Sequence, residues 1–313
     1  MLNQYKEFIS TIHRESDFYE FWDQKINELK NKELVIKNTE TTVIDNITRK
    51  SFLYNSIDDK LISGNLFIPQ NYNENNPVIV MYHGLGANTF GMDYFDLANR
   101  TWLNSGFIVA GFDVRGQNGK SEIEENEIFS EYGLYCRNIL DKNNFYYVKT
   151  YLDGIRLLDC LETFEETKNK DIVCNGGSQG GAITLAVTSL DKRVKLAFAD
   201  IPSNSHIRYM IETNSGGFAN INKMVKENIV KLDDVLKTVS YVDTCNLVSL
   251  INVPVLCSVG ALDRICPPEG FYQAYRQILS EKQLEIYEGY AHGGFDTLHF
   301  PKKLEWIKKY LNK

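Results

Sequence analysis

The pattern of apolar and polar positions changes character near residue 78. Before that point three segments alternate in part and are rich in Val, Ile, Thr and Tyr: 34–44, 48–57 and 60–68. Such alternation is typical of antiparallel strands with one face in water. Upstream, apolar residues recur at helical spacing over 16–32, which predicts a helix with Ser16 or Asp17 as its N-cap.

Beyond residue 78 the apolar runs become continuous. These apolar runs are 78–82, 107–112, 172–174, 194–199 and 255–259. Helix-like segments lie between them and include 93–104, 145–164 and 181–190. Strands that are apolar on both faces lie between two helical layers, and alternation with helices favours parallel pairing. The sequence therefore predicts an α/β fold: a mostly parallel central sheet with antiparallel N-terminal strands and helices on both faces.

Two stretches interrupt this alternation. Residues 115–145 are polar and turn-rich, and residues 202–250 are typical of helices inserted between two core strands. There is no Pro/Ser-rich linker, internal repeat or low-complexity tract, so we interpret 1–313 as a single domain carrying two insertions. Long insertions in a compact domain usually form lids, rims or subunit contacts.

The composition limits the kinds of molecule that the protein is expected to bind. The net charge of −7 argues against nucleic acid, and no apolar stretch approaches the roughly 18 residues that span a membrane. The N-terminus shows no secretory signal, and the six cysteines form no CxxC pair, which predicts a cytoplasmic location. No grouping of residues has the spacing of a metal site or of a phosphate-binding loop, so neither metal nor cofactor is expected.

The strongest candidate for chemistry is Ser178. It lies in a G-x-S-x-G motif, with Gly176 and Gly180 as the outer glycines, between a buried strand and a helix. This is the arrangement of a nucleophile elbow, in which only small neighbours let strand and helix pass and the serine stands exposed at the helix N-terminus. The alternative is a glycine-rich turn with an incidental serine; the strand–turn–helix context favours the elbow of an α/β-hydrolase.

A base and an acid follow in the chain order of that fold, which is Ser, acid, His. His292 comes directly after the last predicted strand, 283–288, and before a predicted helix at 301–312. Asp263 follows the strand 255–259 and can fix the tautomer of His292. His299 is the competing base, but its place beside Pro301 favours a capping or surface role.

An ester carbonyl that Ser178 attacks would also need two donors for its oxyanion. One expected donor is the main-chain N–H of Gln179, and the other is that of Leu85 in the loop after the strand 78–82. His83 precedes that loop on the wrong strand for a base, so we expect its side chain to shape the loop.

Several further segments make the chain resemble carbohydrate esterase family seven, the acetyl xylan esterases and cephalosporin C deacetylases. They are Asp17–Trp22, Arg115-Gly116-Gln117, Asn138–Tyr147, Gly176–Gly181 and the acid loop Gly260–Pro268. The resemblance implies removal of acetyl groups from xylo-oligosaccharides and cephalosporin-type compounds, and a homo-hexamer that admits only small acylated substrates. By their own chemistry, Arg115 and Gln117 would support the catalytic loops. The chain departs from the family at Gly293, where a glutamate is usual, and at Leu85, where an aromatic residue is usual.

Two other functions remain open at this point. An α/β-hydrolase with the same residues could act on other esters or on amide and peptide bonds. A protein that keeps the fold could also be a catalytically silent binding module. The order of Ser178, Asp263 and His292 in the chain argues against the second alternative.

Overall fold

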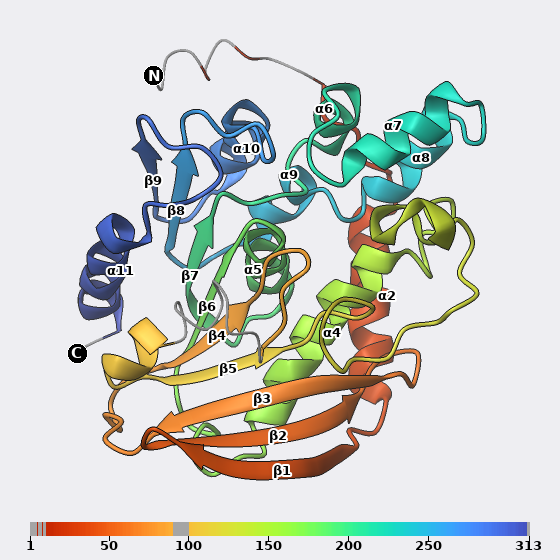
Figure 1. The fold of residues 1–313 in the computed structure, drawn as a ribbon. Helices are drawn as coiled ribbons and strands as arrows, with labels where there is room; N and C mark the ends of the chain where they lie inside the picture. Colours follow the sequence, from red (N-terminus) through yellow and green to blue (C-terminus); the bar gives the residue numbers. More distant parts are fainter. Residues whose placement is uncertain (1–4, 6–7, 9–10, 90–99, 312–313) are drawn as a thin grey trace.

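The computed structural model describes residues 5, 8, 11–89 and 100–311 (Figure 1). Its centre is a nine-stranded sheet with the strand order β1-β2-β3-β5-β4-β6-β7-β8-β9. The strands are β1 (Ile36–Ile44), β2 (Ile47–Asn55), β3 (Leu61–Pro69), β4 (Val78–Tyr82), β5 (Ile108–Phe112), β6 (Ile172–Gly177), β7 (Val194–Asp200), β8 (Val255–Gly260) and β9 (Lys282–Tyr287).

The sheet is mixed, as the hydrophobic pattern predicts. β1, β2 and β3 pair antiparallel with one another, β3 pairs antiparallel with β5, and all pairs from β5 to β9 are parallel. Only β1 is largely exposed. The first half of β2 is partly exposed, but the expected wet face does not continue over its second half and β3. Polar residues there are buried and bonded: Ser51 Oγ donates to Asn65 Oδ1 over 2.8 Å, and Asn65 Nδ2 donates to Thr89 Oγ1 over 2.6 Å.

Helices cover both faces of the sheet. They are α2 (Phe18–Asn31), α4 (Tyr146–Leu161), α5 (Gln179–Leu190), α6 (Ile207–Glu212), α7 (Phe218–Lys226), α8 (Leu232–Val239), α9 (Thr244–Leu247), α10 (Pro268–Gln277) and α11 (Asp296–Tyr310). Of the helix predicted over 93–104, residues 100–104 are helical, and 93–99 lie outside the described residues. None of the helices in the described ranges is both long and apolar enough to cross a membrane.

Alternate residues of the central strands pack into two separate hydrophobic layers, one on each face of the sheet. Val78, Val80 and Tyr82 of β4 pack in the layer that contains α2 and α4. Ile79 and Met81, which point the other way, pack in the layer that contains α11 and the turn of helix around residue 102. A strand buried on both sides has no position for a polar residue, which explains the continuous apolar runs.

α11 begins upstream of its predicted start. We expected a helix over 301–312, but the structure starts it at Asp296 and places Pro301 inside it. The proline interrupts the main-chain bonding near the helix start without ending the helix, and Asp296 in the first turn favours the helix dipole. His299 consequently lies within α11 at 1% exposure, so the surface role expected for it is wrong.

The two insertions meet above the carboxyl ends of the parallel strands. The stretch 115–145 holds the short 3-10 helices Ser130–Tyr132 and Leu134–Cys136, and 202–250 holds α6 to α9 and the 3-10 helix Val248–Leu250. Figure 1 shows α6, α7 and α8 gathered beyond the end of β7. Tyr135 from the first insertion packs edge-on against Phe218 from the second, with ring centroids 4.8 Å apart. Together the insertions form a wall beside the end of β6.

Candidate active site

Ser178 occupies the tight turn between β6 and α5. Its backbone has φ 58° and ψ −119°, a strained conformation for a non-glycine residue. Its N–H donates to the carbonyl oxygen of Asp200 over 2.9 Å, and its carbonyl oxygen accepts the N–H of Ser203 over 3.0 Å. These bonds tie the strained residue to the end of β7.

The flanking glycines are required by close approach. A Cβ on Gly180 would lie 1.8 Å from the carbonyl oxygen of Tyr82, and one on Gly176 would lie 2.4 Å from that of Gly180. Both obstacles are backbone atoms, so neither position can accept a larger residue without moving β4 or α5. The same contact places the loop after β4 directly beside the elbow.

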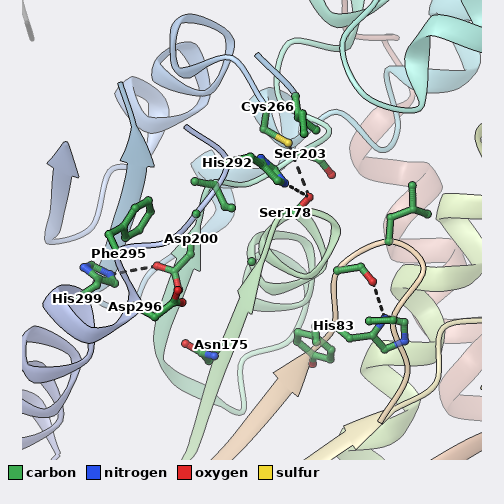
Figure 2. A pocket seen from close by; sticks show the side chains of 18 of the residues that line it. His83, Asn175, Ser178, Asp200, Ser203, Cys266, His292, Phe295, Asp296 and His299 are labelled. Carbon is green, nitrogen blue, oxygen red and sulfur yellow. Dashed lines mark hydrogen bonds and ion pairs between the residues drawn. The ribbon is translucent and has the colours of Figure 1, made fainter. Parts of the chain in front are cut away.

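The structure brings the predicted serine, histidine and aspartate together, and Figure 2 shows His292 joined to Ser178. His292 Nε2 lies 3.0 Å from Ser178 Oγ, and His292 Nδ1 lies 2.8 Å from Asp263 Oδ2. Asp263 is buried, and its other oxygen accepts the N–H groups of Ile265 over 2.8 Å and Cys266 over 3.0 Å. With no proton to give, the carboxylate fixes the proton of His292 on Nδ1 and leaves Nε2 to accept the serine hydroxyl.

His83 shapes the loop that follows β4. Its Nε2 accepts the N–H of Val114 over 2.9 Å, so Nδ1 carries the proton and donates to the carbonyl oxygen of Gly84 over 2.8 Å. Burial lowers the pKa of His83, which keeps the ring neutral. Leu85 follows and is 46% exposed. Gln179 lies in the first turn of α5, where N–H groups have no acceptor within the helix.

The side chain of Gln117 joins the loop that carries Leu85 to the start of α5. Its Oε1 accepts the N–H of Gly86 over 2.8 Å, while its Nε2 donates to Gln179 Oε1 over 2.9 Å and to Tyr146 Oη over 3.0 Å. Gln179 Oε1 also accepts the hydroxyl of Tyr147 over 3.2 Å. One amide group thus sets the spacing between the Leu85 loop and the start of α5.

Arg115 is connected to Gln117 through Tyr146. Its guanidinium is fully buried and donates to both oxygens of Asp153, over 2.8 and 2.7 Å, and to Asp58 over 2.8 Å. Burial opposes ionisation of Asp58, but the Arg115 charge outweighs it and holds the pKa of that carboxyl below its usual value. The carbonyl oxygen of Arg115 accepts the Tyr146 hydroxyl over 2.8 Å, which connects the ion pairs to Gln117.

Several side chains of the site were not foreseen from the sequence. Cys266 Sγ lies 3.9 Å from Ser178 Oγ, and burial raises the pKa of its thiol. Asp200 lies at the carboxyl end of β7 and contacts His299 Nε2 at 3.1 Å. The position of Asp200 at a strand end beside the elbow was a usable signal, since ligand and catalytic groups gather at that edge of α/β sheets. His299 contacts Asp200 and not Ser178.

A cavity of about 920 Å³ opens beside Ser178 Oγ. Its wall includes apolar side chains from the loop after β4, both insertions and the acid loop: Leu85, Tyr135, Met210, Phe218, Ile265 and Cys266. In the described part of the chain no group of three His, Cys, Asp or Glu side chains could hold a metal ion. The arrangement is suited to acyl transfer to a serine.

A mixed sheet with a strained serine at the β6–α5 turn, and an acid and a histidine on the loops after β8 and β9, defines an α/β-hydrolase. The chain belongs to the acetyl xylan esterase (AXE1) family, whose model matches residues 1–310. Acetyl esterase Axe7A of Xylanibacter ruminicola is 27% identical over 238 residues, which are 74% of this chain and 53% of that protein. The chain thus spans about half the length of this curated relative.

Solved structures agree with this assignment. The acetyl xylan esterase from Paenibacillus sp. R4 superposes with a TM-score of 0.87 at 28% sequence identity, over 99% of this chain and 100% of its own. Acetyl xylan esterase 1 from Thermoanaerobacterium sp. JW/SL YS485 has a TM-score of 0.83 at 24% identity, over 97% and 98% of the two chains. At that identity the second likeness bears on the fold alone.

Proposed function

We propose that this protein is a serine carboxylesterase that removes acetyl and other short acyl groups from small esters through an acyl-enzyme. The observation that carries the proposal is the contact of His292 Nε2 with Ser178 Oγ at 3.0 Å, with Asp263 on the opposite ring nitrogen at 2.8 Å. Membership of the acetyl xylan esterase family supports the choice of ester and acyl group.

In the proposed mechanism His292 Nε2 takes the hydroxyl proton as Ser178 Oγ attacks the ester carbonyl carbon. The N–H groups of Gln179 and Leu85 hold the oxyanion, and Asp263 stabilises the imidazolium. His292 then gives the proton to the leaving alcohol oxygen. A water repeats the sequence on the acyl-enzyme, which releases the carboxylic acid and restores the serine.

For the alcohol portion we propose acetylated xylo-oligosaccharides or cephalosporin-type compounds. The printed activities of the relatives, acetyl esterase and acetyl xylan esterase, support this choice. Both proposed donors of the oxyanion hole are main-chain groups, so the family departure at Leu85 alters the pocket wall and not the donor. Gly293, with φ 100°, makes the other departure directly after the base.

We also propose a homo-hexamer and a cytoplasmic location. The resemblance to carbohydrate esterase family seven supports the hexamer. The six cysteines, all buried and free, suit a reducing compartment. Native mass determination tests the first proposal, and a dimer or monomer would contradict it.

The function is tested with wild type, Ser178→Ala and Ser189→Ala. Ser189 lies on α5 and bonds only its own helix, so it is a matched control for a serine-to-alanine change. Wild type and Ser189→Ala should hydrolyse p-nitrophenyl acetate faster than the butyrate and octanoate esters. Both should also react with a fluorophosphonate probe. Ser178→Ala should neither hydrolyse these esters nor react with the probe. Full activity in Ser178→Ala would disprove the assignment. Preferred cleavage of the matching anilide would instead favour an amidase, and an unlabelled wild type would favour a binding module.

A further inference from the structure

Asp200 lies where the nucleophile elbow meets the neighbouring strand. It is the last residue of β7 and pairs in register with Gly177, the residue before the nucleophile. Its carbonyl oxygen accepts the N–H of Ser178 over 2.9 Å. The main chain of Asp200 therefore holds one end of the strained serine.

The carboxylate of the same residue is buried and contacts two other elements, β8 and α11. It accepts the hydroxyl of Ser258 on β8 over 2.6 Å and lies 3.1 Å from His299 Nε2 on α11. Its second oxygen accepts from Lys303 Nζ, one turn further along α11. Lys303 also donates to Asn175 Oδ1 on β6 over 2.7 Å.

These contacts fasten the start of α11 to the edge of the sheet that carries the site. His299 Nδ1 lies 2.9 Å from Tyr287 Oη at the end of β9. Between Tyr287 and α11 the chain makes the short loop that carries His292, and Phe295 of that loop stacks on the Tyr287 ring at 4.3 Å. Figure 2 shows Asp200 and His299 joined on the side of Phe295, while His292 faces Ser178. The base loop is therefore anchored at both of its ends.

We propose that Asp200 is a positioning residue for ester hydrolysis, whose main chain holds Ser178 and whose carboxylate, through Lys303 and His299, holds the helix that follows the His292 loop. One residue thus sets the distance between nucleophile and base. Asp200 touches neither of the reacting groups with its side chain. The inference rests on the proposed function, because it names what aligns that function's serine and histidine.

The electrostatics of the cluster suit an anchor. Burial alone would raise the pKa of Asp200, but Lys303 and His299 outweigh it and hold the pKa well below its usual range. The carboxylate is therefore ionised at neutral pH. A buried anion with a lysine and a histidine against it resists displacement, because separating the charges leaves them unpaired.

The test replaces the buried pair by neutral groups of similar size, in the double variant Asp200→Asn/Lys303→Met. Exchanging both partners avoids leaving one buried charge, which is the usual cause of unfolding. Lys309→Met is the matched control, because Lys309 lies on the same helix as Lys303 but forms an exposed ion pair, with Glu281 just before β9. For each protein we would measure the melting temperature, kcat and KM for p-nitrophenyl acetate, and the rate of fluorophosphonate labelling at Ser178.

We expect the double variant to fold and to lose about tenfold in both kcat and labelling rate with little change in KM, since small displacements of reacting groups cost rate and not binding. Lys309→Met should match wild type. A folded double variant with wild-type kcat and labelling would overturn the proposal. If the double variant does not fold, His299→Gln decides, because it removes the imidazole that contacts Asp200 and keeps Lys303 on Asp200. Wild-type labelling in folded His299→Gln would overturn the proposal, and slower labelling would support it.

The labelling rate separates this inference from the proposed function. Wild type that reacts with the probe but hydrolyses no acetate ester would show that the substrate is wrong, while the comparison of labelling rates would still test Asp200. Wild type that does not react would overturn both proposals, since there would be no activated serine to position.

Discussion

Replacing Gln117 by leucine removes a side chain that bonds both of the segments proposed to supply the oxyanion donors. The change keeps the approximate volume but deletes the bonds to Gly86 N–H, Gln179 Oε1 and Tyr146 Oη, at 2.8, 2.9 and 3.0 Å. Gly86 is exposed, so water can replace its partner. Gln179 is buried but keeps the hydroxyl of Tyr147, so its amide is not left wholly unpaired.

The effect on stability is therefore modest. Each of the two partly buried hydrogen bonds costs about 1 kcal/mol, and the exposed one costs less. Removing an oxyanion donor outright costs about 2.7–4 kcal/mol, or roughly 10²- to 10³-fold in kcat, which is an upper bound here because the donors are displaced and not deleted. We expect a fall in kcat of roughly tenfold to a hundredfold with KM little changed.

The assay is the initial rate of p-nitrophenyl acetate hydrolysis across substrate concentrations, alongside thermal unfolding. Gln24→Leu is the control, since Gln24 bonds only Glu28 on the exposed face of α2. Wild-type kcat in a folded Gln117→Leu enzyme would refute the bridge. A rise in KM with kcat unchanged would show that Gln117 contributes to ground-state binding and not to the oxyanion hole.

Three further outcomes follow from the geometry. Asp263→Asn should lower kcat on the order of 10³- to 10⁴-fold with KM little changed, because it removes the charge that fixes the His292 tautomer. A wild-type kcat for p-nitrophenyl acetate in this variant would contradict the assignment of Asp263 as the acid. Arg115→Met should lower the free energy of unfolding by about 3–5 kcal/mol in urea titrations, because it strands the buried Asp153 carboxylate. Burial lowers the pKa of His83 from 6.5, so the unfolded chain binds more protons and stability should fall as pH drops below that value. The slope contributed is at most about 1.4 kcal/mol per pH unit, and unfolding curves of His83→Gln should lack it.

The fold and the arrangement of Ser178, Asp263 and His292 could be predicted because their signals are local. A strand such as β4 that is buried on both faces is apolar at every position, and the spacing of Gly176, Ser178 and Gly180 is visible in five consecutive residues, although the atom that excludes a side chain at Gly180 belongs to Tyr82 of β4. The loops after β8 and β9 follow from the order of the strands. These properties depend on neighbours in the chain, so one sequence is enough to infer them.

The supporting contacts could not be predicted in the same way. Arg115 meets Asp58 and Asp153, and Lys303 meets Asp200, across large sequence separations that no periodicity encodes. Each of these charges alone is typical of a solvated surface, since isolated lysines and aspartates are mostly exposed. Only the folded backbone shows that they are buried together and therefore paired.

Pro301 explains why the end of the chain was predicted less accurately. A proline favours the first turn of a helix, so the pattern placed the start of the last helix there and left His299 in the preceding loop. The structure instead places Asp296 in the first turn, and the extra turn puts His299 and Lys303 on the same face, one turn apart, where both reach Asp200. Because the loop carrying His292 ends where α11 begins, the earlier start shortens that loop. The position at which α11 starts therefore sets the length of the loop that places His292.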